Sequence, residues 1–301
     1  MTNSFKTVAL VGLFTDSRVA EPMIRLAEYL ANAGITVLAN AATADALSAR
    51  AVADNALSSD ADLIIAIGGD GTMLHAAGLA AGGDVPLLGI NRGRLGFLAD
   101  VSPVDMLESL GQVLAGNYTS ESRLQLQAKI TAADGSQKTA LALNDVVLQR
   151  RETGRMLDFE TRIAKKYVNT HMGDGLIAAT PTGSTAYALS CGGPIIQPRL
   201  DAIVVVPICP HTLSDRPIVI PADQEIEVKL LPREDTKAEI SVDGHTLGEF
   251  GPDDKLVIGE AEHRITLIHP PGYDFYEILR SKLHWGRNVR VQHPPPGPDH
   301  S

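Results

Sequence analysis

Strand-like and helix-like patterns of apolar residues alternate over the first 119 residues. Four apolar runs are typical of buried strands. These runs cover residues 7–14, 36–40, 63–67 and 86–91. Apolar residues at helical spacing lie between them, at 21–33, 43–56 and 73–80. Because alternating strands and helices indicate crossover connections, the pattern predicts an α/β domain with a parallel sheet over residues 1–119.

From about residue 120 the pattern becomes that of strands alone. Residues 123–150 fit two strands joined at Asp134-Gly135, a dipeptide that favours a hairpin turn. Further strand patterns with turn residues between them cover 225–231, 237–247, 254–260 and 263–270. We therefore predict a β-rich, sandwich-like domain over 120–270. A terminal helix over 271–288 is predicted to pack back on the first domain, and a Pro-rich tail over 289–301 is predicted to be disordered.

Composition limits the class of protein. With 301 residues and 44% hydrophobic content, the chain can form two ordinary cores. A formal net charge of -10 disfavours nucleic acid or an anionic membrane as partner, but a local basic cleft could still take a phosphorylated small molecule. Two cysteines, and a start without signal-peptide features, predict a cytoplasmic protein. Neither histidines nor cysteines show the spacing of a structural zinc site.

The turn after the apolar run 63–67 places one acid, Asp70, among Gly68, Gly69 and Gly71. Such a turn is commonly a tight connection in which glycine supplies a positive φ and aspartate bonds its own backbone. In open α/β sheets, however, ligands lie beyond the carboxyl ends of strands, where glycines let backbone amides approach phosphate. A carboxylate there would receive a proton or face a metal held by the phosphates.

The ordinary nucleotide-binding fingerprints are missing. The sequence contains no G-x-x-x-x-G-K-[ST], and the turn after the first strand has a single glycine, Gly12, where a dinucleotide-binding turn has three. The sequence therefore predicts neither a P-loop protein nor a standard nicotinamide dehydrogenase.

Two further stretches interrupt apolar surroundings with polar residues. Residues 173–193 are rich in hydroxyl groups, at Thr180, Thr182, Ser184, Thr185, Tyr187 and Ser190. They fit a turn and a helix capped by Ser184 or Thr185, and also a site for a nucleobase or a phosphate. A nucleophilic serine is disfavoured because no G-x-S-x-G is present. Asn144-Asp145 fits a turn or bulge, or a pair that reads adjacent ribose hydroxyls.

Taken in order, five stretches resemble the bacterial NAD kinases. They are GGDGT at 68–72, INRGRLGFLAD at 90–100, ND at 144–145, DGLIAATPTGSTAYALSCGGP at 174–194 and PHTLSDRPIVI at 210–220. GGDGT alone is shared with diacylglycerol and sphingosine kinases, whereas the full order is specific to NAD kinases. The resemblance implies a nucleotide-binding α/β domain, a β-rich NAD-binding domain, and an active site between them. It also implies ATP-dependent phosphorylation of the adenosine ribose 2′-hydroxyl of NAD, with Mg²⁺ held mainly by the ATP phosphates, in a homodimer or homotetramer.

The resemblance also implies roles for single residues. Asp70 would be the catalytic acid-base residue, and Gly68, Gly69, Gly71 and Thr72 would form the loop for the ATP phosphates. Asn144 and Asp145 would hold the adenosine part of NAD, and Asp174 would contact the nicotinamide end, often across a subunit interface. The adenine side would be bound by Thr185, Ala186, Tyr187, Ala188, Leu189 and Ser190. Arg155 and His245 would touch the dinucleotide.

Two other functions fit parts of the pattern. A lipid kinase of the diacylglycerol or sphingosine type shares GGDGT, but the hydroxyl-rich stretch 180–190 disfavours an apolar acceptor. A non-catalytic NAD(P)-binding sensor would have no need for Asp70 among phosphate-binding glycines. The sequence therefore favours the NAD kinase over both.

Overall fold

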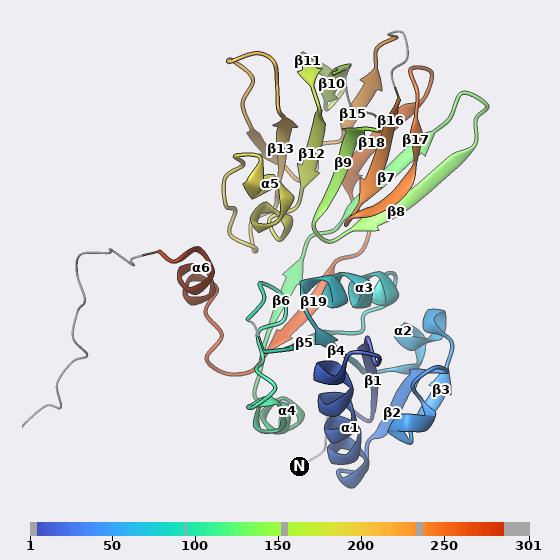
Figure 1. The fold of residues 1–301 in the computed structure, drawn as a ribbon, viewed down its shortest axis with the longest axis vertical. Helices are drawn as coiled ribbons and strands as arrows, with labels where there is room; N and C mark the ends of the chain where they lie inside the picture. Colours follow the sequence, from blue (N-terminus) through green and yellow to red (C-terminus); the bar gives the residue numbers. More distant parts are fainter. Residues whose placement is uncertain (1–4, 94, 152–155, 233–236, 286–301) are drawn as a thin grey trace, which may run out of the picture.

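The computed structural model describes residues 5–93, 95–151, 156–232 and 237–285, and it contains an α/β part and a β-sandwich (Figure 1). The α/β part contains one seven-stranded sheet of order β3-β2-β1-β4-β5-β19-β6. Its strands are β1 (Thr7–Gly12), β2 (Thr36–Asn40), β3 (Arg50–Val52), β4 (Leu63–Gly68), β5 (Leu87–Asn91), β6 (Thr119–Arg123) and β19 (Ile265–His269). The pairings from β3 to β19 are parallel, and only the edge pairing of β6 with β19 is antiparallel.

Helices cover both faces of this sheet. Alternate residues of β4 enter two separate cores, with Ile65 on the side of α1 (Ser17–Asn32) and α4 (Met106–Leu114), and Ile64 on the side of α3 (Asp70–Ala80). Because the central strand β4 is covered on both faces, its sequence LIIAIG is apolar throughout. The predicted α/β domain is confirmed, with an antiparallel strand added at one edge.

The prediction of a helix over residues 43–56 is wrong. The segment contains two short 3₁₀ turns, η1 (Asp45–Leu47) and η2 (Asp54–Ala56), with strand β3 between them, and the four-residue helix α2 (Leu57–Asp60) follows. Ser48 has a φ of 49°, in the left-handed region, which ends η1. The backbone then pairs with β2, so the extended edge strand replaces the helix that the alanine content favours.

The second part is a sandwich of two six-stranded antiparallel sheets (Figure 1). One sheet contains, in order, β11 (Lys166–Gly173), β10 (Leu157–Ile163), β15 (Ile226–Leu230), β18 (Lys255–Glu260), β7 (Leu126–Thr131) and β8 (Gln137–Ala142). The other contains β14 (Ile218–Pro221), β13 (Ala202–Ile208), β12 (Gly175–Ala179), β9 (Asp145–Arg150), β16 (Ala238–Val242) and β17 (His245–Phe250). A single core with Phe159 and Phe250 lies between them. The hairpin predicted at Asp134-Gly135 joins β7 to β8, with Gly135 at a φ of 84°.

Two strands connect the sandwich to the first sheet. The chain leaves through β6 and returns through β19, which lie side by side (Figure 1). Residues 263–270 were predicted in the β-rich part, but β19 joins the first sheet because Ile265 and Leu267 are buried in the core beside α3. The paired strands therefore carry the chain across the boundary between the two parts.

The predicted terminal helix is α6 (Phe275–Leu283), which begins after Asp274, whose side chain accepts from the Tyr276 amide at 2.8 Å. A cavity of about 320 Å³ is lined jointly by α6 and by residues 95–109 of the first part, so the helix returns to that part as predicted. The predicted tail, 289–301, lies outside the described residues. Among the described helices, none combines the length and the apolar character needed to cross a membrane.

Candidate active site

A cavity of about 430 Å³ lies where β1 and β2 end and α3 begins. Gly71, Thr72 and His75 of α3 line one side, and His245 of β17 reaches it from the sandwich. The cavity therefore lies between the two parts, at the carboxyl edge of a parallel sheet, where ligands of such folds bind. Sequence analysis did not single out His75. Its spacing of three residues from Thr72 places both on one helix face, which is the signal that could have found it.

Asp70 is the first residue of α3, and its carboxylate is held by the backbone of a distant loop. Oδ2 accepts from the Phe97 amide at 3.1 Å, and Oδ1 accepts from the amides of Leu98 at 2.9 Å and Ala99 at 3.4 Å. The interpretation of this stretch as a tight turn, with a positive φ at glycine and an aspartate bonded to its own backbone, is wrong in both details. Asp70 accepts hydrogen bonds from residues 97–99, and none of the three neighbouring glycines has a positive φ. Oδ2 keeps an acceptor position free of these bonds.

The glycines around Asp70 differ in what they allow. A Cβ added at Gly69 or Gly71 would meet no atom within 4 Å, so the backbone there is open to a ligand. A Cβ at Gly68 would instead overlap the Thr72 side chain, so this glycine serves close packing inside the turn. Gly96 is similar, because a Cβ at that position would overlap the Asp70 carboxylate. Two of the three glycines, Gly69 and Gly71, therefore have open space beside their backbone.

Asn144 and Asp145 lie where β8 passes into β9, and a carboxylate that sequence analysis missed holds this turn. Asp243 accepts from the amide of Leu143 through Oδ2, and from the amides of Asn144 and Asp145 through Oδ1, at 2.8 to 3.0 Å. Leu143 is buried in the same core as Met73 of α3. The Asn144-Asp145 turn is therefore fixed next to the helix that begins at Asp70.

Asp145 is buried, and its side chain has no hydrogen bond within the described part of the chain. Burial, together with the charge of Asp243, raises the pKa of Asp145 to about 7. Burial also raises the pKa of Asp243, but the three backbone amides oppose that shift. Asp145 is thus the member of the pair that takes up a proton near neutral pH.

This raised pKa predicts a pH dependence of stability. An ordinary aspartate in the unfolded chain has a pKa of about 3.9, so between roughly pH 4 and 7 the folded state keeps a proton that the unfolded state has lost. The free energy of unfolding contributed by Asp145 is therefore highest below pH 4 and falls as the pH rises to about 7. We expect Asp145→Asn to lack this loss and to gain up to about 3 kcal/mol relative to wild type from pH 4.5 to 8. Urea unfolding at several pH values measures the difference, and a pH-independent difference would contradict the assignment.

The hydroxyl-rich stretch forms η3 (Gly183–Thr185) and the single-turn helix α5 (Tyr187–Ser190). Neither Ser184 nor Thr185 is the helix cap that the sequence predicted, because their hydroxyls donate to the carbonyls of Pro181 and Thr182. Those bonds close the turn itself, and α5 begins after Ala186 without a side-chain cap. The stretch is tied to the Asn144 turn, since the Thr180 hydroxyl donates to the Leu143 carbonyl at 2.5 Å.

The remaining predicted residues differ in exposure. Tyr187 and Ser190 are exposed, and Thr185, Ala186 and Leu189 are half-buried, whereas Ala188 is buried in an apolar cluster. Asp174, between β11 and β12, pairs with Arg150 at 3.1 Å. Burial raises the pKa of Tyr187, with smaller effects from Cys191 and Asp174, which shows that these groups are neighbours. Arg155 lies outside the described residues.

Both parts of the chain match models of one protein family. Residues 8–118 match the ATP-NAD kinase N-terminal domain, and residues 143–270 match the ATP-NAD kinase C-terminal domain. The NAD kinase of Nitrosospira multiformis is 45% identical over 288 residues, which cover 95% of this chain and 97% of that protein. The NAD kinase of Nitrosococcus oceani is 44% identical, with 96% of this chain and 100% of that protein covered. The chain belongs to the ATP-NAD kinase family.

Solved structures agree with this fold. Yeast NADH kinase complexed with NADH matches with a TM-score of 0.89 over 97% of this chain and 91% of that chain, at 23% identity. An NAD kinase from Archaeoglobus fulgidus in complex with ATP matches with a TM-score of 0.73 over 92% of this chain and 98% of that chain, at 26% identity. The sequence prediction of the family and of its two-part fold is confirmed.

Proposed function

We propose that this chain transfers the terminal phosphoryl group of ATP to the 2′-hydroxyl of the adenosine ribose of NAD, which gives NADP. One observation carries the proposal. The Asp70 carboxylate is fixed by backbone amides of residues 97–99, and the next two residues, Gly71 and Thr72, line the cavity between the two parts. This geometry supports a role for Asp70 as an oriented acceptor and for the neighbouring glycines as a phosphate-binding loop.

Phosphoryl transfer needs in-line positioning and stabilisation of charge on the phosphate oxygens more than it needs covalent chemistry. The backbone at Gly69 and Gly71 would approach the triphosphate, and Thr72 and His75 line the cavity beside it. Asp70 would accept the 2′-hydroxyl hydrogen through the free position of Oδ2 and orient the oxygen for attack. Because a carboxylate is a weak base, orientation contributes as much as removal of the proton.

Mg²⁺ held by the ATP phosphates would neutralise charge on the transferring group. The open backbone at Gly69 and Gly71 fits a metal that arrives with the triphosphate, since a Cβ at either position would meet no atom within 4 Å. In the described part of the chain, no group of three or more His, Cys, Asp or Glu side chains is placed to hold a metal. We propose that the ATP phosphates are the main ligands of the metal.

NAD would bind along the sandwich side of the cavity. Asn144 would donate to a ribose hydroxyl through its amide group, and the Asp145 carboxylate would accept from the ribose hydroxyls. His245 lines the cavity itself. The adenine side would be formed by Thr185, Ala186, Tyr187, Ala188, Leu189 and Ser190, with Asp174 towards the nicotinamide end. Support comes from the hydrogen bond between Thr180 and Leu143, which joins this segment to the Asn144 turn.

We further propose a cytoplasmic homodimer or homotetramer. Cys191 and Cys209 are free thiols, in keeping with a reducing compartment. Exposed apolar residues occur on the strands at or next to one edge of each sandwich sheet, at Tyr167, Val168, Ile218 and Val219. Patches of this kind suit a symmetric contact between copies.

The decisive assay is formation of NADP from NAD and ATP by the purified protein. We expect NADP with Mg²⁺ present and none when the metal is chelated. A parallel reaction offers a diacylglycerol in place of NAD, and we expect no phosphorylated lipid. Folded protein that binds NAD but forms no NADP would overturn the proposal in favour of a sensor, and lipid phosphorylation would overturn it in favour of a lipid kinase.

A further inference from the structure

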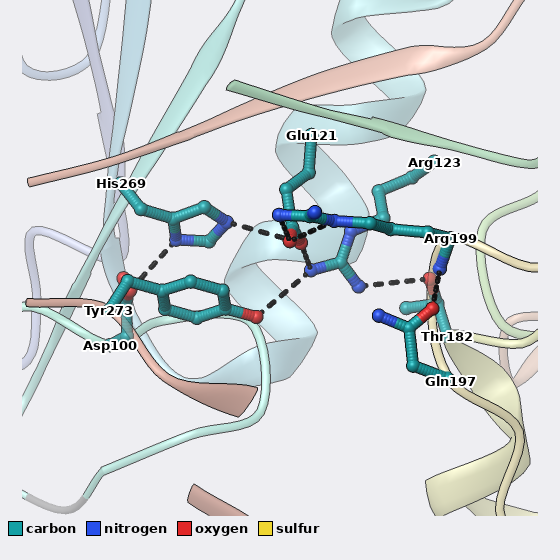
Figure 2. Close-up of polar contacts among 8 residues, drawn as sticks. All are labelled: Asp100, Glu121, Arg123, Thr182, Gln197, Arg199, His269 and Tyr273. Atoms are coloured by element: carbon teal, nitrogen blue, oxygen red, sulfur yellow. Dashed lines mark hydrogen bonds and ion pairs between the residues drawn. The ribbon is translucent and has the colours of Figure 1, made fainter. Parts of the chain in front are cut away.

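A buried polar cluster joins side chains of both parts of the chain (Figure 2). Its centre is β6, on which Glu121 and Arg123 are two residues apart and so point to the same face. The side chains of Glu121 and Arg123 are 4% and 2% exposed, and Arg123 Nη2 lies 2.5 Å from Glu121 Oε2. Burial alone would raise the pKa of Glu121, but the charge of Arg123, with contributions from Arg199 and His269, holds it below the ordinary value. The pair is therefore ionised.

From this strand the cluster reaches into the sandwich at two points. Arg123 Nη1 donates to the Thr182 hydroxyl at 3.4 Å, and Arg199 donates to Glu121 Oε1 at 2.9 to 3.0 Å (Figure 2). Thr182 directly precedes η3, and Arg199 follows α5 by nine residues. Both ends of the segment 182–199, which contains the proposed adenine-binding residues, are thus bound to one strand of the first part.

The same cluster extends towards Asp70. His269 Nδ1 lies 2.8 Å from Asp100 Oδ2, and His269 Nε2 lies 3.7 Å from Glu121 Oε2, an ion-pair distance too long for a hydrogen bond. Asp100 directly follows Ala99, whose amide donates to Asp70. Tyr273 stacks on His269 with ring centroids 3.7 Å apart and accepts from Arg123 at 3.2 Å. Contacts therefore run from the loop that holds Asp70 to the segment 182–199.

The buried charges of Glu121 and Arg123 are not explained by a contribution to the stability of the fold. Removing two buried ions from water costs several kcal/mol each, and replacing a buried ion pair by apolar residues is often neutral or stabilising. Within the described part of the chain, Arg123 Nε and Asp100 Oδ1 of this cluster have no hydrogen-bond partner. The ion pair instead fixes the relative positions of the groups around it, because a planar guanidinium donates hydrogen bonds at defined angles.

We propose that Arg123 and Glu121 are positioning residues, which clamp both ends of the segment 182–199 and so fix the NAD-binding turn relative to Asp70. This inference rests on the proposed function, because it assigns a consequence for NAD binding. The two proposals predict different results. If only this inference is correct in its detail, an enzyme that has lost these contacts still makes NADP but has a higher KM for NAD.

The test is a double-mutant cycle on Arg123 and Thr182. Arg123→Lys keeps a charge beside Glu121 but cannot reach Thr182 in the same geometry, and Thr182→Val removes the accepting hydroxyl at nearly constant shape. We expect each change to raise the KM for NAD roughly fivefold, with the KM for ATP and kcat within about twofold of wild type. The double variant should be no worse than either single variant, because both remove one interaction.

Tyr273→Phe is the matched control, since it removes a different hydrogen bond of the same guanidinium, one that does not reach the segment 182–199. We expect it to lower the melting temperature about as much as Arg123→Lys and to leave the KM for NAD unchanged. The inference is overturned by an unchanged KM for NAD in Arg123→Lys, by additive effects in the double variant, or by an equal rise in Tyr273→Phe. Loss of all NADP formation in the wild type would instead refute the proposed function.

Discussion

Asp70→Asn is expected to lower kcat by about 10²-fold or more while the protein stays folded. Both oxygens of the carboxylate accept hydrogen bonds from backbone amides of residues 97–99. The remaining lone pair of Oδ2 is the proposed acceptor for the 2′-hydroxyl. A carboxamide has one accepting oxygen, so in either orientation its NH₂ group faces a backbone N–H or the substrate hydroxyl. The change removes both the negative charge and the orientation. Steady-state kinetics with NAD and ATP measure the loss.

Asp105→Asn makes the same chemical change at an exposed position preceding α4 and is expected to leave kcat unchanged. The KM for NAD in Asp70→Asn should remain within a few-fold of wild type, because the change leaves the proposed ribose-binding pair, Asn144 and Asp145, in place. Turnover like that of the wild type in Asp70→Asn would remove this residue from the mechanism.

Gly183→Ala is expected to damage both stability and NAD binding. A Cβ at this position would overlap the main chain of Asn144 at its O, C and Cα atoms, which cannot rotate away as a side chain would. The turn before α5 and the Asn144 turn must then separate, at a cost of about 3 kcal/mol in the free energy of unfolding. Because that separation also moves the proposed ribose-binding pair, the KM for NAD should rise at least about tenfold. Thermal unfolding and kinetics on one preparation report the two effects.

Gly78→Ala is the comparison, because a Cβ there meets no atom within 4 Å and the residue lies inside α3. Alanine at that position should leave activity unchanged and stabilise the protein by up to about 1 kcal/mol. If Gly183→Ala behaves like Gly78→Ala, then the close approach to Asn144 does not matter for the site.

Local patterns in the sequence predicted the elements that carry the site, and non-local pairing explains the failures. The apolar run of β4 and the helical spacing of α3 are properties of consecutive residues, so the strand before Asp70 and the helix after it were both predicted. The helix predicted at 43–56 failed because β3 forms only by pairing with β2. β19 was placed in the wrong sheet because its partners lie far away in the sequence, with Leu267 opposite Leu87.

The candidate site shows the same division. The motifs identified Asp70 and the Asn144-Asp145 pair, but the groups that hold them were not found. Asp243 lies 99 positions from Asn144, and Phe97 lies 27 positions from Asp70, so neither contact follows from local spacing. Glu121 and Arg123 belong to the polar sequence TSESR of β6, and only the packing of the two parts shows that they are buried.

The position of β19 in the first sheet also bears on how the chain folds. This strand lies between β5 and β6, so residues 119–123 have no partner in the sheet until residues 265–269 are available. During synthesis the whole sandwich must therefore leave the ribosome before the α/β part can be completed. Contacts between such distant segments are slow to form, since the entropy of closing the long loop must be lost first. The sheet of the α/β part therefore gains its last two strands only after nearly all of the described chain has been made.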